Sequence, residues 1–334
     1  MKGLINLLIY VKKISKICVW LFIIVPCSAF AVSGPFAPPS GKTLLFVGQD
    51  RDTVANYVQA TGNNIPGGAM FYSSVARIEG LLEPSDAGSA PMDGEALLKS
   101  YPNSVIQLGL YMVDESKDTL AGTYDANLKI LAQWIKKANR PVYLRIGYEF
   151  DNPDNHYDPQ EYKQAFRYIV DFLRKERVEN AAYVWHSQCW GEKASQQWMD
   201  WYPGDGYVDW FASSLFSMPS GAWISLDFIK LAREHHKPFM IAESAPWGLY
   251  SVRAKMDWYK HIFQFIKDQK VDAFCYINSN WDATPMWKGL HIGDSRVEVN
   301  ADVKDLWLNE INTGNYIKAS PDLFRLLGWT KSKK

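Results

Sequence analysis

The sequence contains little cysteine and carries no excess of either charge. Only 4 of its 334 residues are Cys, and 36 basic residues balance 36 acidic ones, so the formal net charge is zero. A nucleic-acid-binding protein usually shows a basic surplus, and a charged tail shows a long run of one sign. We therefore expect no nucleic-acid partner and no such tail.

Several short motifs are also missing. The 6 His residues form no HExxH pattern, and the adjacent pair His235 and His236 must point in different directions. No G-x-S-x-G surrounds Ser244, and no glycine-rich loop follows the first apolar run, Thr43–Gln49. These absences argue against a zinc protease, a serine hydrolase and a nucleotide-binding sheet. We expect neither a metal ion nor another cofactor.

The N-terminus has the pattern of a secretory signal. Four Lys residues and no acidic residue lie within the first 16 positions, followed by the apolar run Ile17–Val25 and then Ala29-Phe30-Ala31. This pattern predicts a signal peptide over residues 1–31, cut after Ala31, and a secreted or periplasmic protein. An uncleaved anchor is the alternative, although the apolar run is shorter than the roughly 20 residues of a membrane span.

Removal of the signal leaves 32 basic and 36 acidic residues, a net charge of −4. It also leaves two cysteines, Cys189 and Cys275, which we expect to be free and buried because they belong to predicted strands that are not neighbours. Residues 32–41 contain three prolines and suggest a short linker. No repeat or second linker follows, so residues 42–334 are expected to form a single domain and a monomer.

Eight short apolar runs alternate with segments of helical spacing. Each run is rich in branched or aromatic residues, as a buried parallel strand requires. Eight such units in about 240 residues match a (β/α)8 barrel, with a doubly wound open sheet as the alternative. The runs are Thr43–Gln49, Gly68–Val75, Ser104–Met112, Pro141–Asp151, Ala181–Gln188, Val208–Phe216, Pro238–Pro246 and Val271–Trp281.

The fourth run places charged residues at alternate positions. Arg145, Gly147 and Glu149 share one face of a strand, while Leu144, Ile146, Tyr148 and Phe150 share the other. The apolar set should face the helices, so Arg145 and Glu149 should point into the barrel. Active sites of such barrels lie at the C-terminal ends of the strands, which makes Glu149 a candidate catalytic residue.

The seventh run ends in the same way. Phe239, Ile241 and Glu243 share one parity, and Glu243 lies near the C-terminal end of the run. Two glutamates on opposite sides of a barrel mouth have the arrangement that glycoside hydrolysis requires, with one acid and one attacking or activating carboxylate. The alternative is a pair of structural salt bridges. Arg145 is the candidate donor that keeps one carboxylate ionised.

These segments resemble a known group of enzymes. LRIGYEFD in the fourth run and PFMIAESAP in the seventh are similar to the acid/base and nucleophile strands of retaining glycosidases with β/α barrels. WYPGDGYVDWF at Trp201–Phe211 is similar to the stretch before the sixth strand of glycoside hydrolase family 26. The resemblance implies that Glu149 is the general acid/base, that Glu243 is the nucleophile and that the anomeric configuration is retained.

The chain departs from that family at two positions. Tyr148 stands before the acid/base, where mannan-cleaving members typically have His. Phe216 occupies the expected end of the sixth strand, where the clan usually has a Tyr that hydrogen-bonds with the nucleophile. Trp281 resembles the tryptophan that floors the subsite of the cleaved sugar, with a core Trp as the alternative.

Further candidates for substrate binding lie near the predicted mouth. The sequence has 14 Trp, 18 Tyr and 16 Phe, which suits either an aromatic core or a sugar-binding cleft. Trp190 and Trp247 follow the fifth and seventh runs, and Asp50 ends the first. His186 is either a core histidine or a site residue. The full set of candidate binding residues is Arg145, Tyr148, His186, Trp190, Trp247, Trp281 and Asp50.

These features together predict a secreted, retaining endo-β-glycanase that acts on β-mannan, mixed-linkage β-glucan or β-xylan. Two alternatives remain open at this point. The first is a non-catalytic carbohydrate-binding barrel, and the second is a barrel in which Glu149 and Glu243 bind a metal.

Overall fold

The computed structural model describes residues 33–86, 90–189, 197–216 and 222–330. The predicted signal peptide and Trp190 lie outside these residues.

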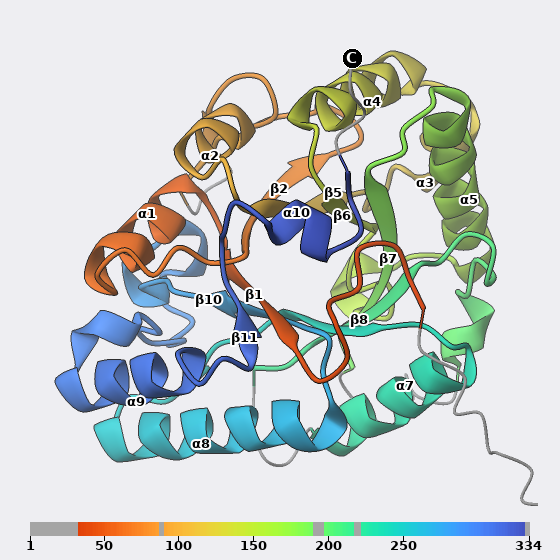
Figure 1. Ribbon diagram of the computed structural model, residues 1–334. Coiled ribbons are helices and arrows are strands. Elements are labelled where there is room, and N and C mark those ends of the chain that lie inside the picture. Colours follow the sequence, from red (N-terminus) through yellow and green to blue (C-terminus); the bar gives the residue numbers. More distant parts are fainter. Residues whose placement is uncertain (1–32, 87–89, 190–196, 217–221, 331–334) are drawn as a thin grey trace, which may run out of the picture. The chain divides into compact units, whose positions relative to one another are not determined.

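Eight parallel strands close into a barrel, as the sequence predicted (Figure 1). Their order is β10-β9-β8-β7-β6-β5-β2-β1, and β10 pairs with β1 over Leu44–Gly48, which closes the ring and excludes an open sheet. Each strand corresponds to one of the eight apolar runs. The strands are β1 (Thr43–Gly48), β2 (Gly68–Ser74), β5 (Val105–Tyr111), β6 (Val142–Ile146), β7 (Ala181–Ser187), β8 (Trp210–Ser214), β9 (Phe239–Glu243) and β10 (Ala273–Ile277).

Helices cover the outside of the barrel (Figure 1). Asp158 shows why one of them begins where it does: its carboxylate accepts hydrogen bonds from the amides of Gln160 and Glu161, and Pro159 occupies the first turn of α5. The helices are α1 (Arg51–Ala60), α2 (Gly94–Ser100), α3 (Ser116–Leu120), α4 (Asp125–Ala138), α5 (Pro159–Lys175), α7 (Ala222–Glu234), α8 (Val252–Gln269), α9 (Ala301–Ile311) and α10 (Leu323–Leu326).

Smaller elements complete the fold. β3 (Ser85–Asp86) and β4 (Pro91–Met92) form an antiparallel pair, and β11 (Tyr316–Ile317) adds to the start of β1. The short 3-10 turns are η1 (Pro153–Asn155), η2 (Trp198–Asp200), η3 (Trp281–Ala283), η4 (Pro285–Trp287) and η5 (Val297–Val299). No helix within the described ranges is long and apolar enough to cross a membrane.

Two apolar layers form the core. The outer layer lies between strands and helices and includes Leu144, Ile146 and Phe211. The inner layer fills the barrel, where the Tyr143 ring lies edge-on to Phe46 at 5.2 Å and to Trp210 at 5.3 Å. These large rings close the interior below the mouth, so the barrel is a packed core and its function lies at the strand ends.

The N-terminal end of the barrel is covered by both ends of the described chain. Tyr143 donates a 2.7 Å hydrogen bond to the carbonyl of Phe36, and Trp210 donates one of 2.8 Å to the carbonyl of Pro35. Residues 33–41, which the sequence suggested as a linker, are thus packed against the barrel. The α10 helix lies over the centre of the ring of strands (Figure 1), and its Leu323 joins the inner layer.

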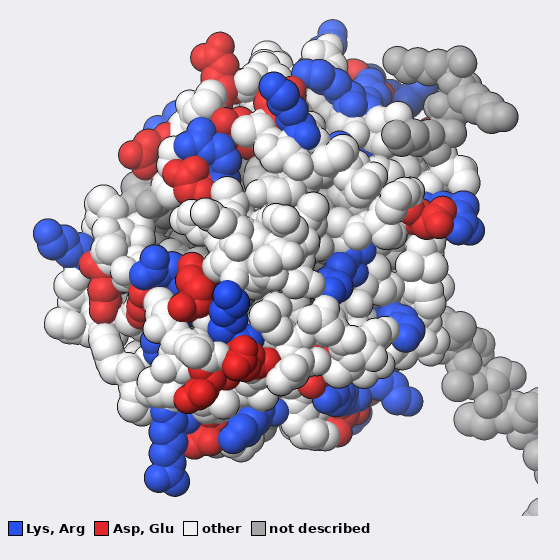
Figure 2. Space-filling view, turned by 60° about the vertical axis from the view of Figure 1, so that its left-hand side comes forward, with Lys and Arg blue, Asp and Glu red and all other residues white. Residues whose placement is uncertain are grey.

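Charge is mixed on the surface. Basic and acidic side chains are interspersed on the face in Figure 2, and neither sign gathers there into one large patch. Cys189 and Cys275 are free and buried, as predicted.

Candidate active site

The two candidate catalytic glutamates lie at the C-terminal ends of β6 and β9. β6 ends at Ile146, and the chain then turns through Gly147 and Glu149, whose φ angles are +53° and +52°. A Cβ at Gly147 would lie 2.8 Å from the Tyr162 ring, so glycine is needed for space as well as for its conformation. Glu149 therefore stands on a turn beyond the strand, at the mouth of the barrel.

The turn after Glu149 is fixed by its neighbours. Asp151 accepts hydrogen bonds from the Ser187 hydroxyl and the Gln188 amide, both at 2.6 Å, and from the Trp198 indole at 3.0 Å. The side-chain amide of Asn155 donates to the carbonyl of Glu149 at 2.9 Å. This hydrogen bonding holds a left-handed, non-glycine residue in place, a conformation that needs support from its surroundings.

Glu243 reaches the mouth by a route that the sequence did not reveal. Phe239 and Ile241 face the helices in the outer layer, whereas Met240 and Ala242 face the barrel interior. Phe239 and Ile241 were predicted to point into the barrel together with Glu243. That prediction is wrong, because both side chains face the helices. An irregularity pairs Ser213 with Ile241 but Ser214 with Glu243, and such a bulge redirects the following side chain.

Arg145 pairs with Glu243 inside the barrel. Its Nη1 donates to Oε1 of Glu243 at 2.5 Å, and the arginine side chain is fully buried. Burial opposes the charge of Arg145, but the Glu243 carboxylate and the Tyr72 hydroxyl outweigh that effect and raise the pKa of the guanidinium. Arg145 therefore stays charged and supplies the positive neighbour that an ionised Glu243 needs.

Tyr72 on β2 is a second neighbour of this ion pair. The Cζ atom of Arg145 lies 5.2 Å from the centre of the Tyr72 ring, and the Tyr72 hydroxyl lies within the electrostatic influence of Glu243. Burial and the charge of Glu243 raise the pKa of Tyr72 well above its usual value, so the hydroxyl keeps its proton. Phe216 has no hydroxyl, whereas Tyr72 on β2 is a tyrosine that stands beside this ion pair.

Gly109 provides the space for this contact. Tyr72, Gly109 and Arg145 lie in register across the neighbouring strands β2, β5 and β6. A Cβ at Gly109 would lie 2.5 Å from Cδ1 of Tyr72 and 3.0 Å from Nη2 of Arg145. The absence of a side chain between them lets the tyrosine ring lie against the guanidinium.

Glu149 has different surroundings. The Ser214 hydroxyl donates to its Oε1 at 2.6 Å, and Asn152 donates to Oε2 at 3.4 Å, while no ion pair with Glu149 occurs among the described residues. Burial, followed by the negative charge of Glu243, raises the pKa of Glu149 to about 7. Glu149 can therefore hold a proton near neutral pH, as a general acid must.

His186 connects the two halves of the site. It lies fully buried on β7, with Nδ1 3.2 Å from Nη1 of Arg145 and Nε2 3.1 Å from the Ser214 hydroxyl. Burial and the charge of Arg145 lower the pKa of His186 well below its usual value, so the ring is neutral. The polar contacts thus run without a break from Glu243 through Arg145, His186 and Ser214 to Glu149.

Two predicted binding residues differ from expectation. Tyr148 was expected to face the helices, but after the turn at Gly147 its ring lies 5.1 Å from Arg145 and 5.3 Å from the Tyr72 ring. Asp50 caps α1: one oxygen accepts from the Thr53 amide at 2.7 Å and the other from its hydroxyl at 2.6 Å. Asp50 therefore has a structural role as a helix cap, and its contact with sugar stays a prediction.

An aromatic cluster occupies the other side of the mouth. Trp281, at the start of η3, lies 5.7 Å from Trp287, 6.3 Å from Phe216 and 6.5 Å from Trp247 between ring centres. Only 3% of Trp281 is exposed, so it packs as a core residue within this cluster, and its contact with a sugar stays a prediction. Trp247 is only partly buried and packs on Phe216 at 4.9 Å.

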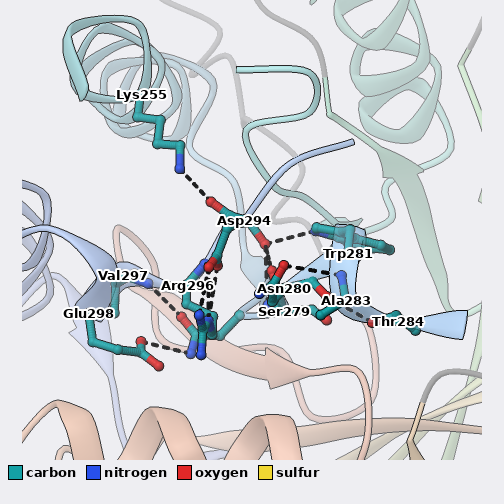
Figure 3. A network of polar contacts seen from close by, with 12 residues as sticks. Lys255, Ser279, Asn280, Trp281, Ala283, Thr284, Asp294, Arg296, Val297 and Glu298 are labelled. Carbon is teal, nitrogen blue, oxygen red and sulfur yellow. Dashed lines mark hydrogen bonds and ion pairs between the residues drawn. The ribbon is translucent and has the colours of Figure 1, made fainter. Parts of the chain in front are cut away.

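A polar network holds Trp281 in this cluster (Figure 3). The Trp281 indole donates to the Ser295 hydroxyl at 2.8 Å, and the Ser279 amide donates to the same oxygen at 3.2 Å. Asp294 next to it forms an ion pair with Arg296 at 2.6 Å, and its carbonyl accepts from Lys255 at 2.6 Å. The segment after β10 is thereby fixed to the barrel.

Sequence reasoning missed Tyr72, Ser214 and Gly109. Each is the inward residue near the C-terminal end of an apolar run, so strand alternation was the available signal. Among the described residues, no group of three or more His, Cys, Asp or Glu side chains could hold a metal ion.

The sequence is similar to that of known glycoside hydrolases. Residues 126–222 match the model of glycosyl hydrolase family 26. A β-1,3-xylanase from Vibrio sp is 32% identical over 332 residues, covering 91% of this chain and 72% of that protein. A β-1,3-xylanase from Alcaligenes sp is also 32% identical, over 90% of this chain and 70% of that protein.

The fold has relatives among solved structures. An endo-β-1,4-mannanase from Cellulomonas fimi superimposes with a TM-score of 0.63 at 19% identity, over 85% of this chain and 74% of that chain. At this identity the likeness concerns the fold alone. The matching family segment and the relatives that align with about nine tenths of this chain show that it belongs to glycosyl hydrolase family 26 and is an endo-acting glycoside hydrolase.

Proposed function

We propose that the chain is an exported, retaining endo-β-1,3-xylanase with Glu149 as general acid/base and Glu243 as nucleophile. The relatives that align with about nine tenths of the chain are named β-1,3-xylanases, which supports the choice of β-1,3-xylan over mannan and mixed-linkage glucan. The opposite surroundings of the two glutamates carry the assignment of their roles.

In the first step, the Glu243 carboxylate attacks the anomeric carbon and the glycosidic C–O bond breaks. Glu149 gives its proton to the departing oxygen, so the leaving chain departs as a neutral alcohol. Arg145 donates to Glu243 and holds its carboxylate in place before attack. The product of this step is a xylosyl ester of Glu243 and an ionised Glu149.

In the second step, Glu149 acts as a base. It takes a proton from water, the resulting hydroxide oxygen attacks the anomeric carbon, and the ester bond to Glu243 breaks. Both carboxyl groups return to their initial states, and two inversions give net retention. The loss of charge from Glu243 in the ester removes the interaction that most favours protonation of Glu149 after burial, so its pKa falls when a base is needed.

The substrate lies across the mouth between two aromatic groups. Trp281 and Trp247 line one side, and Tyr148 with the 42% exposed Tyr111 lines the other. Aromatic faces bind the C–H faces of pyranose rings. Rings on both sides of the carboxylates suit a chain that extends past the cleaved bond, as in endo cleavage.

Export follows from the N-terminal pattern. We expect residues 1–31 to be removed and the remaining chain to act as a monomer outside the cytoplasm. N-terminal sequencing of the protein recovered from the medium or periplasm tests this directly, and Val32 is the expected first residue.

The substrate is tested with residues 32–334 on a panel of β-1,3-xylan, β-1,4-xylan, β-mannan and mixed-linkage β-glucan. Reducing ends and the length of the products are measured in parallel. The proposal predicts that only β-1,3-xylan is cleaved efficiently and that early products are oligosaccharides of mixed length. Preferred cleavage of mannan would refute the substrate, and release of single sugars from the start would refute endo action.

A further inference from the structure

The hydrogen bonds between Arg145 and Glu149 have only one consistent direction. Arginine has no acceptor, so its Nη1 must donate to Nδ1 of His186 across the 3.2 Å contact. A neutral ring that accepts at Nδ1 carries its proton on Nε2, which lies 3.1 Å from the Ser214 oxygen. His186 therefore donates to Ser214.

The hydroxyl of Ser214 makes the next hydrogen bond in this series. Its oxygen accepts from His186, and its own O–H donates to Oε1 of Glu149 at 2.6 Å. The other oxygen, Oε2, receives only a long contact of 3.4 Å from Asn152. Since Oε1 accepts the short hydrogen bond from Ser214, the acidic proton of Glu149 is placed on Oε2.

We propose that His186 and Ser214 are positioning residues that confine the acidic proton of Glu149 to Oε2. This inference rests on the proposed role of Glu149 as general acid. Arg145 starts the chain of donors, because it is permanently charged and fully buried. The chain therefore keeps its direction whether Glu149 is protonated or ionised, and the same oxygen serves as acid in the first step and as base in the second.

Few other charges act on Glu149. Glu243 on β9 and Asp151 on the following turn both favour its protonated form, while Ser214 and Asn152 favour the ionised form. Arg145 on β6 reaches it through His186 on β7, which is neutral. Loss of the Ser214 donor should therefore shift the basic limb of activity to higher pH.

The test compares Ser214→Ala with Ser213→Ala. Ser213 is the preceding residue of β8, is also buried, and points to the opposite side of the strand. Ser214→Ala should lower kcat/KM on polysaccharide about tenfold, a part of the roughly 10²–10⁴ that general acid catalysis contributes. It should also move the basic limb of the pH profile upward, and Ser214→Thr should restore both.

A second readout separates proton positioning from a merely structural effect. On an aryl xyloside with an activated leaving group, which needs little acid assistance, the first step of Ser214→Ala should match that of the wild type. His186→Phe should resemble Ser214→Ala, and the double variant should be no worse than either, because the two residues act in one chain.

Two results would overturn the inference. One is an unchanged pH profile and leaving-group dependence in Ser214→Ala, and the other is full additivity of the two single variants. Glu149→Ala serves as the reference: if it retains acid catalysis, the role of Glu149 itself fails, which is a different result from failure of the positioning residues.

Discussion

Arg145 donates to Glu243 across 2.5 Å inside the barrel, and neither group has another ion-pair partner among the described residues. A buried charge that loses its partner costs about 3–5 kcal/mol or takes up a proton. The ion pair therefore fixes the position of Glu243, and removing either partner alone would leave the other charge buried without compensation.

Arg145→Met should abolish most activity. Without the guanidinium, Glu243 can avoid the cost of a buried charge only by protonation, and a protonated nucleophile does not attack. We expect kcat to fall by at least about a hundredfold and the protein to lose about 3 kcal/mol of stability. The double variant Arg145→Met/Glu243→Leu should regain stability without activity. Wild-type kcat in Arg145→Met would contradict this role.

The pH dependence of activity should report Glu149. The general acid must be protonated, and the pKa of Glu149 is raised to about 7 by burial and by Glu243. The value of kcat/KM should therefore fall as pH rises through about 7. The measurement is a pH profile from 4 to 10 with an unactivated xylo-oligosaccharide. A basic limb that persists unchanged in Glu149→Gln would assign it to another group.

The same raised pKa should make the folded state less stable at high pH, where Glu149 is ionised. The folded state holds its proton up to about 7, whereas the unfolded chain releases it near the ordinary value of 4.5. Stability from this group is therefore complete below pH 4.5 and is lost as pH rises to 7. Glu149→Gln should melt higher than the wild type at pH 8 and equal it at pH 4. Equal melting at both values would argue against a raised pKa.

Gly109→Ala should separate Tyr72 from Arg145. The added Cβ would lie 2.5 Å from the Tyr72 ring, and such overpacking typically costs about 1–3 kcal/mol. We expect a lower kcat with little change in KM, because the displaced tyrosine no longer supports the nucleophile Glu243. Gly206→Ala is the matched control, since nothing lies within 4 Å of a Cβ there. Equal kcat in the two variants would show that Tyr72 does not assist Glu243.

Ser295→Ala should loosen Trp281. It leaves the Trp281 indole and the Ser279 amide without their acceptor, which costs about 1–3 kcal/mol for buried donors. KM should rise more than kcat falls, and the tryptophan fluorescence should change. Ser104→Ala, at the opposite end of the barrel, removes a buried 2.8 Å hydrogen bond to Pro66. It should reduce stability alone, so a similar KM increase there would count against a local effect on Trp281.

The barrel was predictable from the sequence because each strand is a separate apolar run. The order of strands follows from the chain order in a (β/α)8 barrel, and the alternation along β6 placed Arg145 correctly. Glu149 and Glu243 stood out as candidates because charged residues are rare at the ends of such runs.

The finer geometry was not predictable from alternation. The bulge before Glu243 reverses its side, and the turn at Gly147 moves Tyr148 from the helix face to the mouth. Both effects depend on neighbouring strands and not on the local pattern. The cap that Asp50 provides for α1 was also not predicted, although a carboxylate three residues before Thr53 is a typical N-cap.

The central claim is the division of roles between Glu149 and Glu243, and the configuration of azide products tests it most directly. Glu149→Ala and Glu243→Ala are each incubated with azide and an activated β-xyloside, and the glycosyl azide is identified by NMR. The proposed roles predict a β-azide from Glu149→Ala, because azide attacks the ester on Glu243, and an α-azide from Glu243→Ala, because azide replaces the missing carboxylate. The reverse pair of products would exchange the two roles, and no azide product from either variant would contradict the retaining mechanism.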